Sequence, residues 1–385
     1  MEFRMNVIES AQSVDEFTPI RTLGHGDMGT VYLAKHMTSG KPVAMKVMSK
    51  ELMQKKRSHK RAWMEKEILQ KLDHPFLPKL FTKFESKNHS FLLMSYCSGG
   101  DLNTLRQRQK DRKFSESAAR FYAAEVVLAL EYLHQHGILY RDLKPENILL
   151  QADGHIMITD FDLSLMINNS QESRAKDSYR DQNGSCKKKT KSFLAKLNPG
   201  HVGAKDCMNA SAMITTKQDD SAKETSFCHL DGRKESVYEQ AHSFVGTEEY
   251  VAPEILWGKG HGIAVDWWAF GVLLYEMVYG KTPFKGCNRK ETFYNILCKE
   301  PPQLSEHSSP LKDLLRRLLV KEPTLRLGFN SGAQEIKNHE FFEGVRWDEL
   351  EYVSRPPFVP PPFSFEHSRI VMDDSVHTIE MFENF

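Results

Sequence analysis

One short stretch, Tyr140-Arg141-Asp142-Leu143-Lys144-Pro145-Glu146-Asn147, brings a carboxylate, an ammonium group and a carboxamide close together. A carboxylate such as Asp142 can accept a hydroxyl proton, Lys144 can neutralise a phosphoryl group in transfer, and Asn147 can hold a metal ion. Asp160 follows an apolar run and would bind Mg²⁺ that bridges phosphates. These residue types in this order predict chemistry on a phosphorylated ligand.

A second segment with chemical potential is Gly24-His25-Gly26-Asp27-Met28-Gly29-Thr30-Val31. Its glycines let backbone N–H groups approach phosphate oxygens because no Cβ blocks them. Taken alone, the segment is as well explained by a glycine-rich turn. A dinucleotide-binding fold would continue with a helix and a later acid. Here Val43-Ala44-Met45-Lys46 follows, so Lys46 is expected on a half-buried strand, clamping α/β-phosphates, with a solvated surface lysine as the alternative.

The elements that must position these residues change character along the chain. Alternating apolar residues predict strands within 17–48, near 80–84 and near 91–96. Helical spacing predicts one helix over 51–72 and others over 116–135, 266–279 and 311–320. A β-rich part therefore precedes an α-rich part, with 95–100 as the expected hinge. The Pro- and Phe-rich segment from about Val345 is expected to form an extended strap, not a helix.

Composition excludes several classes of protein. The chain has 385 residues, 40% apolar and 27% charged, with a net charge of +1. This argues against a generally basic nucleic-acid binder and against an acidic disordered chain. Six cysteines show no paired or metal-type spacing, which favours a reduced, intracellular compartment. Residues 1–10 do not have the pattern of a signal peptide, and the apolar stretch 269–279 is too short to span a bilayer.

Residues from about 166 to 242 differ from the rest. Only nine of these 77 residues, about 12%, are Leu, Ile, Val or Phe, which is too few to support a core. We expect a disordered insertion. Within it, residues 187–197 carry five lysines with interleaved Phe and Leu. This basic segment is interpreted as a nuclear address or an anionic-lipid contact, with a solvated loop as the alternative.

The motifs together resemble a eukaryotic protein Ser/Thr kinase of the AGC group, related to the cyclic-AMP-dependent kinase. They read GHGDMGTV, VAMK, YRDLKPEN, DFD, SFVGTEEY, VAPE and VDWWAFGVLLYEM. Asp-Phe-Asp with a long insertion is similar to the plant-specific branch that includes PINOID and the phototropins, and the glycine-rich loop looks closest to UNICORN-like members. The resemblance implies an α+β, two-lobed kinase fold. It divides the chain into an N-terminal extension (1–16), a kinase domain (17–342, with a β-rich N-lobe 17–95 and a helical C-lobe 96–342), and an AGC tail (343–385).

The resemblance also assigns roles, with ATP and Mg²⁺ as cofactors. Lys46 would pair with the α/β-phosphates and with Glu65, while Asp142 would act as the catalytic base and Lys144 would support the γ-phosphate. Asn147 and Asp160 would hold Mg²⁺. The residues implied in ATP binding are Leu23, Gly24, His25, Gly26, Asp27, Met28, Gly29, Thr30, Val31, Ala44, Lys46, Met94 as gatekeeper, Ser95, Tyr96 and Cys97 of the hinge, and Asp101.

Further carried-over roles concern the scaffold and the activation loop. Arg326 should pair with Glu254, and Asp266 should anchor the catalytic loop. A phosphate on Ser243 would meet Arg141 and Arg61, whereas Leu165 replaces a lysine that the related kinase uses there. Asp162 stands where most kinases have glycine; we interpret this as altered activation dynamics, not inactivity.

Substrate and partner expectations follow from the same resemblance. Asp101, Glu146 and Glu276 match positions that receive Arg or Lys before the target residue, which favours basophilic substrates, although these acids could instead be structural. Thr247 resembles the residue that selects Ser/Thr over Tyr. The terminal Phe382 and Phe385 resemble a hydrophobic motif that docks the phosphoinositide-dependent kinase; a disordered tail is the alternative.

The expected function is ATP-dependent transfer of phosphate to Ser/Thr of protein substrates, including autophosphorylation, in intracellular plant growth signalling. We expect a monomer that is cytoplasmic and nuclear and that also associates peripherally with membranes. Two alternatives stay open: a pseudokinase scaffold, and a nucleic-acid- or lipid-binding regulator that uses the basic segment.

Overall fold

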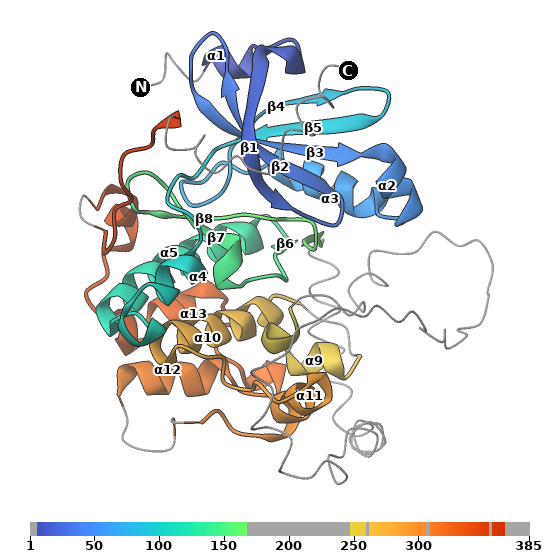
Figure 1. Ribbon diagram of the computed structural model, residues 1–385. Coiled ribbons are helices and arrows are strands. Elements are labelled where there is room, and N and C mark those ends of the chain that lie inside the picture. The colour runs from blue at the N-terminus through green and yellow to red at the C-terminus, as the bar shows by residue number, and fades with distance from the viewer. Residues whose placement is uncertain are drawn as a thin grey trace, which may run out of the picture.

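The computed structural model describes residues 6–167, 247–258, 262–302, 304, 309–353 and 356–365. Two lobes are visible: a five-stranded sheet at the top and a mainly helical part below it (Figure 1). The expected α+β, two-lobed architecture is confirmed. The candidate site residues lie where the two lobes meet.

The sheet of the small lobe is antiparallel throughout. Gly29 shows why the sequence here is restricted: a Cβ on it would lie 1.9 Å from the carbonyl oxygen of Val47, so only glycine lets the two strands approach this closely. Val31 pairs with Lys46, which places the glycine-rich turn beside the lysine. In spatial order the strands are β1 (Phe17–His25), β2 (Gly29–His36), β3 (Pro42–Ser49), β5 (His89–Met94) and β4 (Leu80–Glu85).

Residues before the first strand pack against the same lobe. Helix α1 (Asn6–Glu9) contacts β4, and η2 (Val14–Glu16) leads into β1. Ile8 is buried in a cluster with residues of the sheet, and Glu9 forms an ion pair of 2.7 Å with Lys79. The N-terminal extension is therefore, in its described part, packed on the outer face of the small lobe.

The prediction of a single helix over 51–72 is wrong. The chain forms α2 (Lys50–Lys55) and α3 (His59–Leu69), separated by a turn in which Arg57 has a φ of 51°. A residue in the left-handed region interrupts the helical hydrogen-bond ladder. Apolar spacing continues across the break, so periodicity could not reveal it.

The large lobe is built around α10 (Ala264–Tyr279), which is buried along nearly its whole length and contacts α5 (Glu116–Gln135) and α12 (Pro310–Leu318). These three helices confirm the expected segments at 116–135, 266–279 and 311–320. Other described helices of this lobe include α4 (Leu102–Gln107), η3 (Lys110–Arg112), η7 (Glu248–Tyr250), α9 (Pro253–Leu256), α11 (Arg289–Cys298), η8 (Pro323–Leu325), α13 (Ala333–Lys337) and η9 (Glu340–Phe342).

Two small strand pairs hold the loop that carries Asp142. Strand β6 (Ile138–Leu139) pairs with β9 (Leu165–Met166), and β7 (Ile148–Leu150) pairs with β8 (Ile156–Ile158). The loop runs from the end of β6 to the start of β7 and includes η4 (Pro145–Asn147). Met166, at the expected start of the insertion, belongs to β9. Residues 168–246 lie outside the described residues, and with them Ser243 and the basic segment 187–197.

The C-terminal segment departs from the expected strap at its start. Residues Trp347–Tyr352 form the 3₁₀ helix η10, so the extended part begins only after it. There Phe358 packs against Phe114 and Tyr122, and Phe363 lies 5.2 Å from the ring of Tyr96. The strap thus crosses the hinge, whereas Phe382 and Phe385 lie outside the described residues. None of the described helices combines the length and apolar character that crossing a membrane requires.

Candidate active site

A cavity of about 450 Å³ lies between the two lobes, within the size range of small-molecule sites. Its walls come from the glycine-rich turn, β3, the hinge and the loop at β8. Most residues that the resemblance implied in ATP binding line it: Leu23, Gly24, His25, Gly26, Asp27, Gly29, Val31, Ala44, Lys46, Met94, Ser95, Tyr96, Cys97 and Asp101.

Two expected residues do not line this cavity. Met28 is almost fully buried in the hydrophobic core, and the hydroxyl of Thr30 lies 3.0 Å from Nδ1 of His25. Conversely, Leu149 and Thr159 face the cavity and were missed. In the sequence, these two residues are marked only by their positions beside Asn147 and Asp160 in strand-forming runs. An apolar or hydroxyl side chain on a strand does not itself indicate that a ligand binds there.

Lys46 is held by two carboxylates. Its Nζ lies 2.6 Å from Oε1 of Glu65 on α3 and 3.9 Å from Oδ1 of Asp160. Burial by itself would lower the pKa of Lys46, but Glu65 and Asp160 outweigh it, so the pKa is raised. The ammonium group is therefore charged and directed at the cavity, and the alternative of a solvated surface lysine is ruled out by its burial.

Asp160 and Asp162 form an acidic edge of the cavity. Asp160 has a φ of 63°, a conformation that is rare outside glycine and that clusters at functional sites. Burial and the neighbouring Asp160 carboxylate raise the pKa of Asp162 to about 7. Asp162, the aspartate that stands in place of glycine, also lines the cavity. Its side chain changes between the neutral and the charged form near neutral pH.

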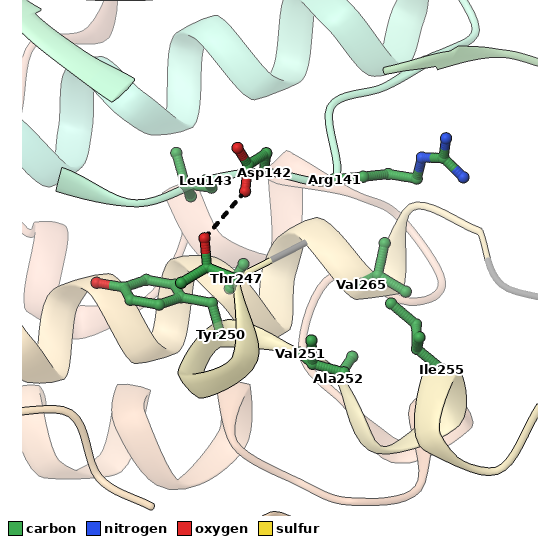
Figure 2. Close-up of a pocket in the computed structure, with 10 residues that line it drawn as sticks. Arg141, Asp142, Leu143, Thr247, Tyr250, Val251, Ala252, Ile255 and Val265 are labelled. Atoms are coloured by element: carbon green, nitrogen blue, oxygen red, sulfur yellow. Dashed lines mark hydrogen bonds between the residues drawn. The ribbon is translucent and has the colours of Figure 1, made fainter. Parts of the chain in front are cut away.

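Asp142 is the centre of the second cluster. Its Oδ2 accepts hydrogen bonds from Nζ of Lys144 at 2.8 Å and from Nδ2 of Asn147 at 2.9 Å. The hydroxyl of Thr247 donates to Oδ1 at 3.3 Å and accepts from Lys144 at 3.2 Å. Figure 2 shows the Thr247 hydroxyl directed at the Asp142 carboxylate across the loop. The structure thus joins residues that are 105 positions apart in the chain.

Asp266, at the start of α10, fixes the backbone of this loop. Its carboxylate accepts hydrogen bonds from the N–H groups of Tyr140 at 3.0 Å and of Arg141 at 2.7 Å. Nε2 of His134 lies 2.8 Å from the same carboxylate. The carboxylate is fully buried, so three directed contacts compensate its desolvation and set the position of Asp142 one residue further on.

Arg141 is the residue expected to meet an activation-loop phosphate. Its Nε donates to the carbonyl of Leu163 at 2.7 Å, which ties the loop to the segment after Asp160. Burial lowers the pKa of Arg141 to about 10; Asp266 opposes this shift and Arg61 adds to it. Arg61 lies on the exposed surface of α3.

The acids expected to receive basic substrate residues have different surroundings. Asp101 caps α4, since its carboxylate accepts from the N–H of Thr104 at 2.7 Å. Glu146 is exposed and accepts from Nδ2 of Asn103. Glu276 is mostly buried and forms an ion pair of 2.8 Å with Arg106, which sequence reasoning did not foresee.

The donor set for a metal ion is small but suitable. Asn147 and Asp160 both line the cavity, and an amide and a carboxylate oxygen are ligands that Mg²⁺ prefers when phosphates and water supply the rest. Among the described residues, no group of three or more His, Cys, Asp or Glu side chains could hold a metal ion on its own. The residues therefore fit an ion that arrives with a phosphorylated ligand.

The chain is similar in sequence to a known protein family and to several known proteins. A family model described as "Protein kinase domain" matches residues 17–187 and 227–342. The chain is 46% identical over 373 residues to "Serine/threonine-protein kinase UCN" from Arabidopsis thaliana, a match that covers 90% of this chain and 84% of that protein.

Other relatives are longer than this chain. "Protein kinase G11A" from Oryza sativa subsp. japonica is 44% identical over 92% of the chain, which spans 62% of that protein. "Serine/threonine-protein kinase KIPK1" from Arabidopsis thaliana is 45% identical over 91% of the chain, but only 39% of that protein is covered. These matches confirm the resemblance stated from the motifs.

Proposed function

We propose that this chain, which belongs to the protein kinase family and to its plant AGC group, transfers the γ-phosphate of ATP to serine or threonine hydroxyls of proteins. The observation that carries the proposal is the cluster on Asp142, which Lys144, Asn147 and Thr247 contact within 3.3 Å. A carboxylate held in this way can orient a hydroxyl group and accept its proton. The cavity beside it has the size and lining of a nucleotide site.

Each charged residue has a separate task in this proposal. Asp142 positions the acceptor hydroxyl and accepts its proton, while Lys144 neutralises charge on the transferred group. Lys46, fixed by Glu65, holds the phosphates from the side of the small lobe. Because phosphoryl transfer needs little covalent help, positioning and charge neutralisation supply most of the acceleration.

We further propose Mg²⁺ as the accompanying cation. Asn147 and Asp160 would hold it, and when bound it would neutralise negative charge between the phosphates. Nδ2 of Asn147 donates to Asp142, so Oδ1 of Asn147 is the atom that would bind the cation. Thr247 contacts both Asp142 and Lys144, and this supports serine or threonine as the residue that accepts the phosphate.

Partners and location are proposed mainly from the sequence. Phe382 and Phe385 would dock the phosphoinositide-dependent kinase, which would phosphorylate Ser243, and the basic segment 187–197 would contact anionic lipid or direct nuclear import. The protein would autophosphorylate, act in the cytoplasm and the nucleus, and associate peripherally with membranes. Arg141 and its neighbour Arg61 support the phosphate on Ser243.

The test is Asp142→Asn, assayed with radiolabelled ATP and a serine peptide. Transfer should fall by about 10²–10⁴-fold because the base is lost, while nucleotide contacts through Lys46 remain. Binding of a fluorescent ATP analogue should change little. The exposed Asp348, changed to Asn, is the matched control and should keep full transfer. Near-normal transfer by Asp142→Asn would refute the assignment, and a wild-type protein that binds ATP without transfer would support the scaffold alternative.

A further inference from the structure

The glycine-rich turn between β1 and β2 is in contact with the end of helix α2. Inside the turn, the N–H of Gly26 donates to the carbonyl of Gly29 at 2.8 Å. Nζ of Lys56, the residue that follows α2, donates to the carbonyl oxygen of Asp27 at 3.0 Å and lies 3.4 Å from Oδ1 of the same residue. One ammonium group thus meets two acceptors of Asp27, in the middle of the turn.

Met28, the next residue of the turn, is attached to the interior of the protein. Its side chain is only 1% exposed, and it belongs to the buried apolar cluster that also includes Met48 of β3 and Met53 of α2. Its neighbours Asp27 and Gly29, by contrast, line the cavity between the lobes. The turn therefore has one side on the cavity and is held on the other side by a buried apolar side chain and by the contact with Lys56.

Helix α2 is itself fixed to the small lobe. The N–H of Lys50, its first residue, donates to the carbonyl of Asn88 at 2.9 Å, in the turn between β4 and β5. The helix follows directly on β3 and also contacts α3 (Figure 1). Because β3 carries Lys46 and α3 carries Glu65, a contact that holds the turn to α2 also fixes the turn relative to this ion pair.

The contact between Lys56 and Asp27 is exposed, and this limits its strength. The side chains are 50% and 73% exposed, and ion pairs in contact with water change an equilibrium only severalfold. A contact of this strength can break and form again as a ligand enters or leaves the cavity. The preceding Lys55 differs, because its Nζ lies 2.6 Å from Oε1 of Glu51, one turn back on the same helix.

We propose that Lys56 is a positioning residue for the proposed kinase reaction, on which this inference rests. By holding Asp27, it keeps the glycine-rich turn closed over the cavity and slows the release of a bound nucleotide. Lys56 acts through the turn and does not touch the nucleotide. When the contact is lost, the buried Met28 still anchors the turn, so the turn opens more often but does not detach.

The experiment makes two measurements on the full-length chain. The first is the rate at which a fluorescent ADP analogue is released, followed by stopped flow after addition of excess ATP. The second is amide hydrogen exchange of residues 22–33, measured without nucleotide. Lys56→Met should raise both rates by about two- to fivefold and leave the midpoint of thermal unfolding unchanged. Lys56→Arg keeps the charge and the donors, so it should restore both rates to nearly the wild-type values.

The matched control is Lys55→Met, which removes the same charge from the same helix and should behave as the wild type. Equal acceleration in Lys55→Met and Lys56→Met would overturn the inference, because net charge would then explain the effect. Unchanged rates in Lys56→Met would overturn it too, and so would faster release with unchanged exchange, since Lys56 would then act on the nucleotide directly. A wild-type chain that binds no analogue would overturn the proposed function; the exchange measurement would still decide whether Lys56 holds the turn.

Discussion

Arg326 and Glu254 illustrate how single residues hold the large lobe together. Both side chains are fully buried, and the guanidinium meets the carboxylate through two contacts, of 2.7 and 2.9 Å. Nη1 of Arg326 also donates to the carbonyl of Ala264 at 2.7 Å, at the start of α10. Since α10 carries Asp266, which positions the catalytic loop, this pair stabilises the part of the lobe that supports the active site.

Arg326→Met should therefore destabilise the protein by about 3–5 kcal/mol, because it leaves the Glu254 carboxylate buried without its cation. The free energy of unfolding, measured by urea titration, gives the size of the effect. The double variant Arg326→Met with Glu254→Leu removes both charges and should recover much of the loss. If the single and double variants were equally unstable, packing and not charge would explain the cost.

At the scale of elements, a buried pair joins α5 to the C-terminal segment. Nδ1 of His155 lies 2.5 Å from Oε1 of Glu125, and Nε2 lies 3.2 Å from the carbonyl of Val353, at the end of η10. A carbonyl can only accept, so Nε2 must carry a proton. A second proton must then lie between Nδ1 and the carboxylate, on one or the other.

This pair predicts a pH dependence. Burial would lower the pKa of His155, but Glu125 outweighs it and the pKa is raised; burial raises the pKa of Glu125. The folded state thus holds the shared proton more tightly than the unfolded state, so the stabilisation is complete below about pH 6.5 and is lost as the pH rises above it. We expect residues 347–353 to exchange amide hydrogens faster at pH 8.5 than at pH 6, after correction for intrinsic rates. Glu125→Gln with His155→Gln should abolish this difference in exchange rate. If residues 347–353 of that variant still exchanged faster at pH 8.5 than at pH 6 by the same factor, the explanation would be refuted.

Elements also show how far the sequence determined the outcome. Strands and long helices were predictable because apolar spacing encodes them, and the loop with Asp142 was predictable because its chemistry is local. The break at Arg57 was not, since a left-handed arginine leaves no mark on periodicity. Nor was the pair of Arg106 with Glu276, because 170 positions separate them and only the folded lobe brings them together.

At the scale of the whole molecule, the described residues on either side of 168–246 are fixed to the folded core. The N–H of Ile167 donates to the carbonyl of Gly137 at 2.7 Å, next to β6, and Thr247 contacts Asp142 and Lys144. The anchors on both sides therefore belong to the folded core. The composition of the segment is too polar to form a core of its own.

Replacing residues 170–238 by a Gly/Ser linker of about ten residues should consequently leave folding and basal transfer intact. Shortening a loop changes its closure entropy only slowly, by about 0.6 kcal/mol for each halving of length, so the midpoint of thermal unfolding should move by no more than a few degrees. Cell distribution should change, because the basic segment 187–197 is removed. The control keeps the full length and replaces the lysines at 187, 188, 189, 191 and 196 by glutamine; it should reproduce the change in distribution. Insoluble protein after the deletion would mean that the segment is needed for folding. An unchanged cell distribution in both variants would mean that the lysines do not determine where the protein is found.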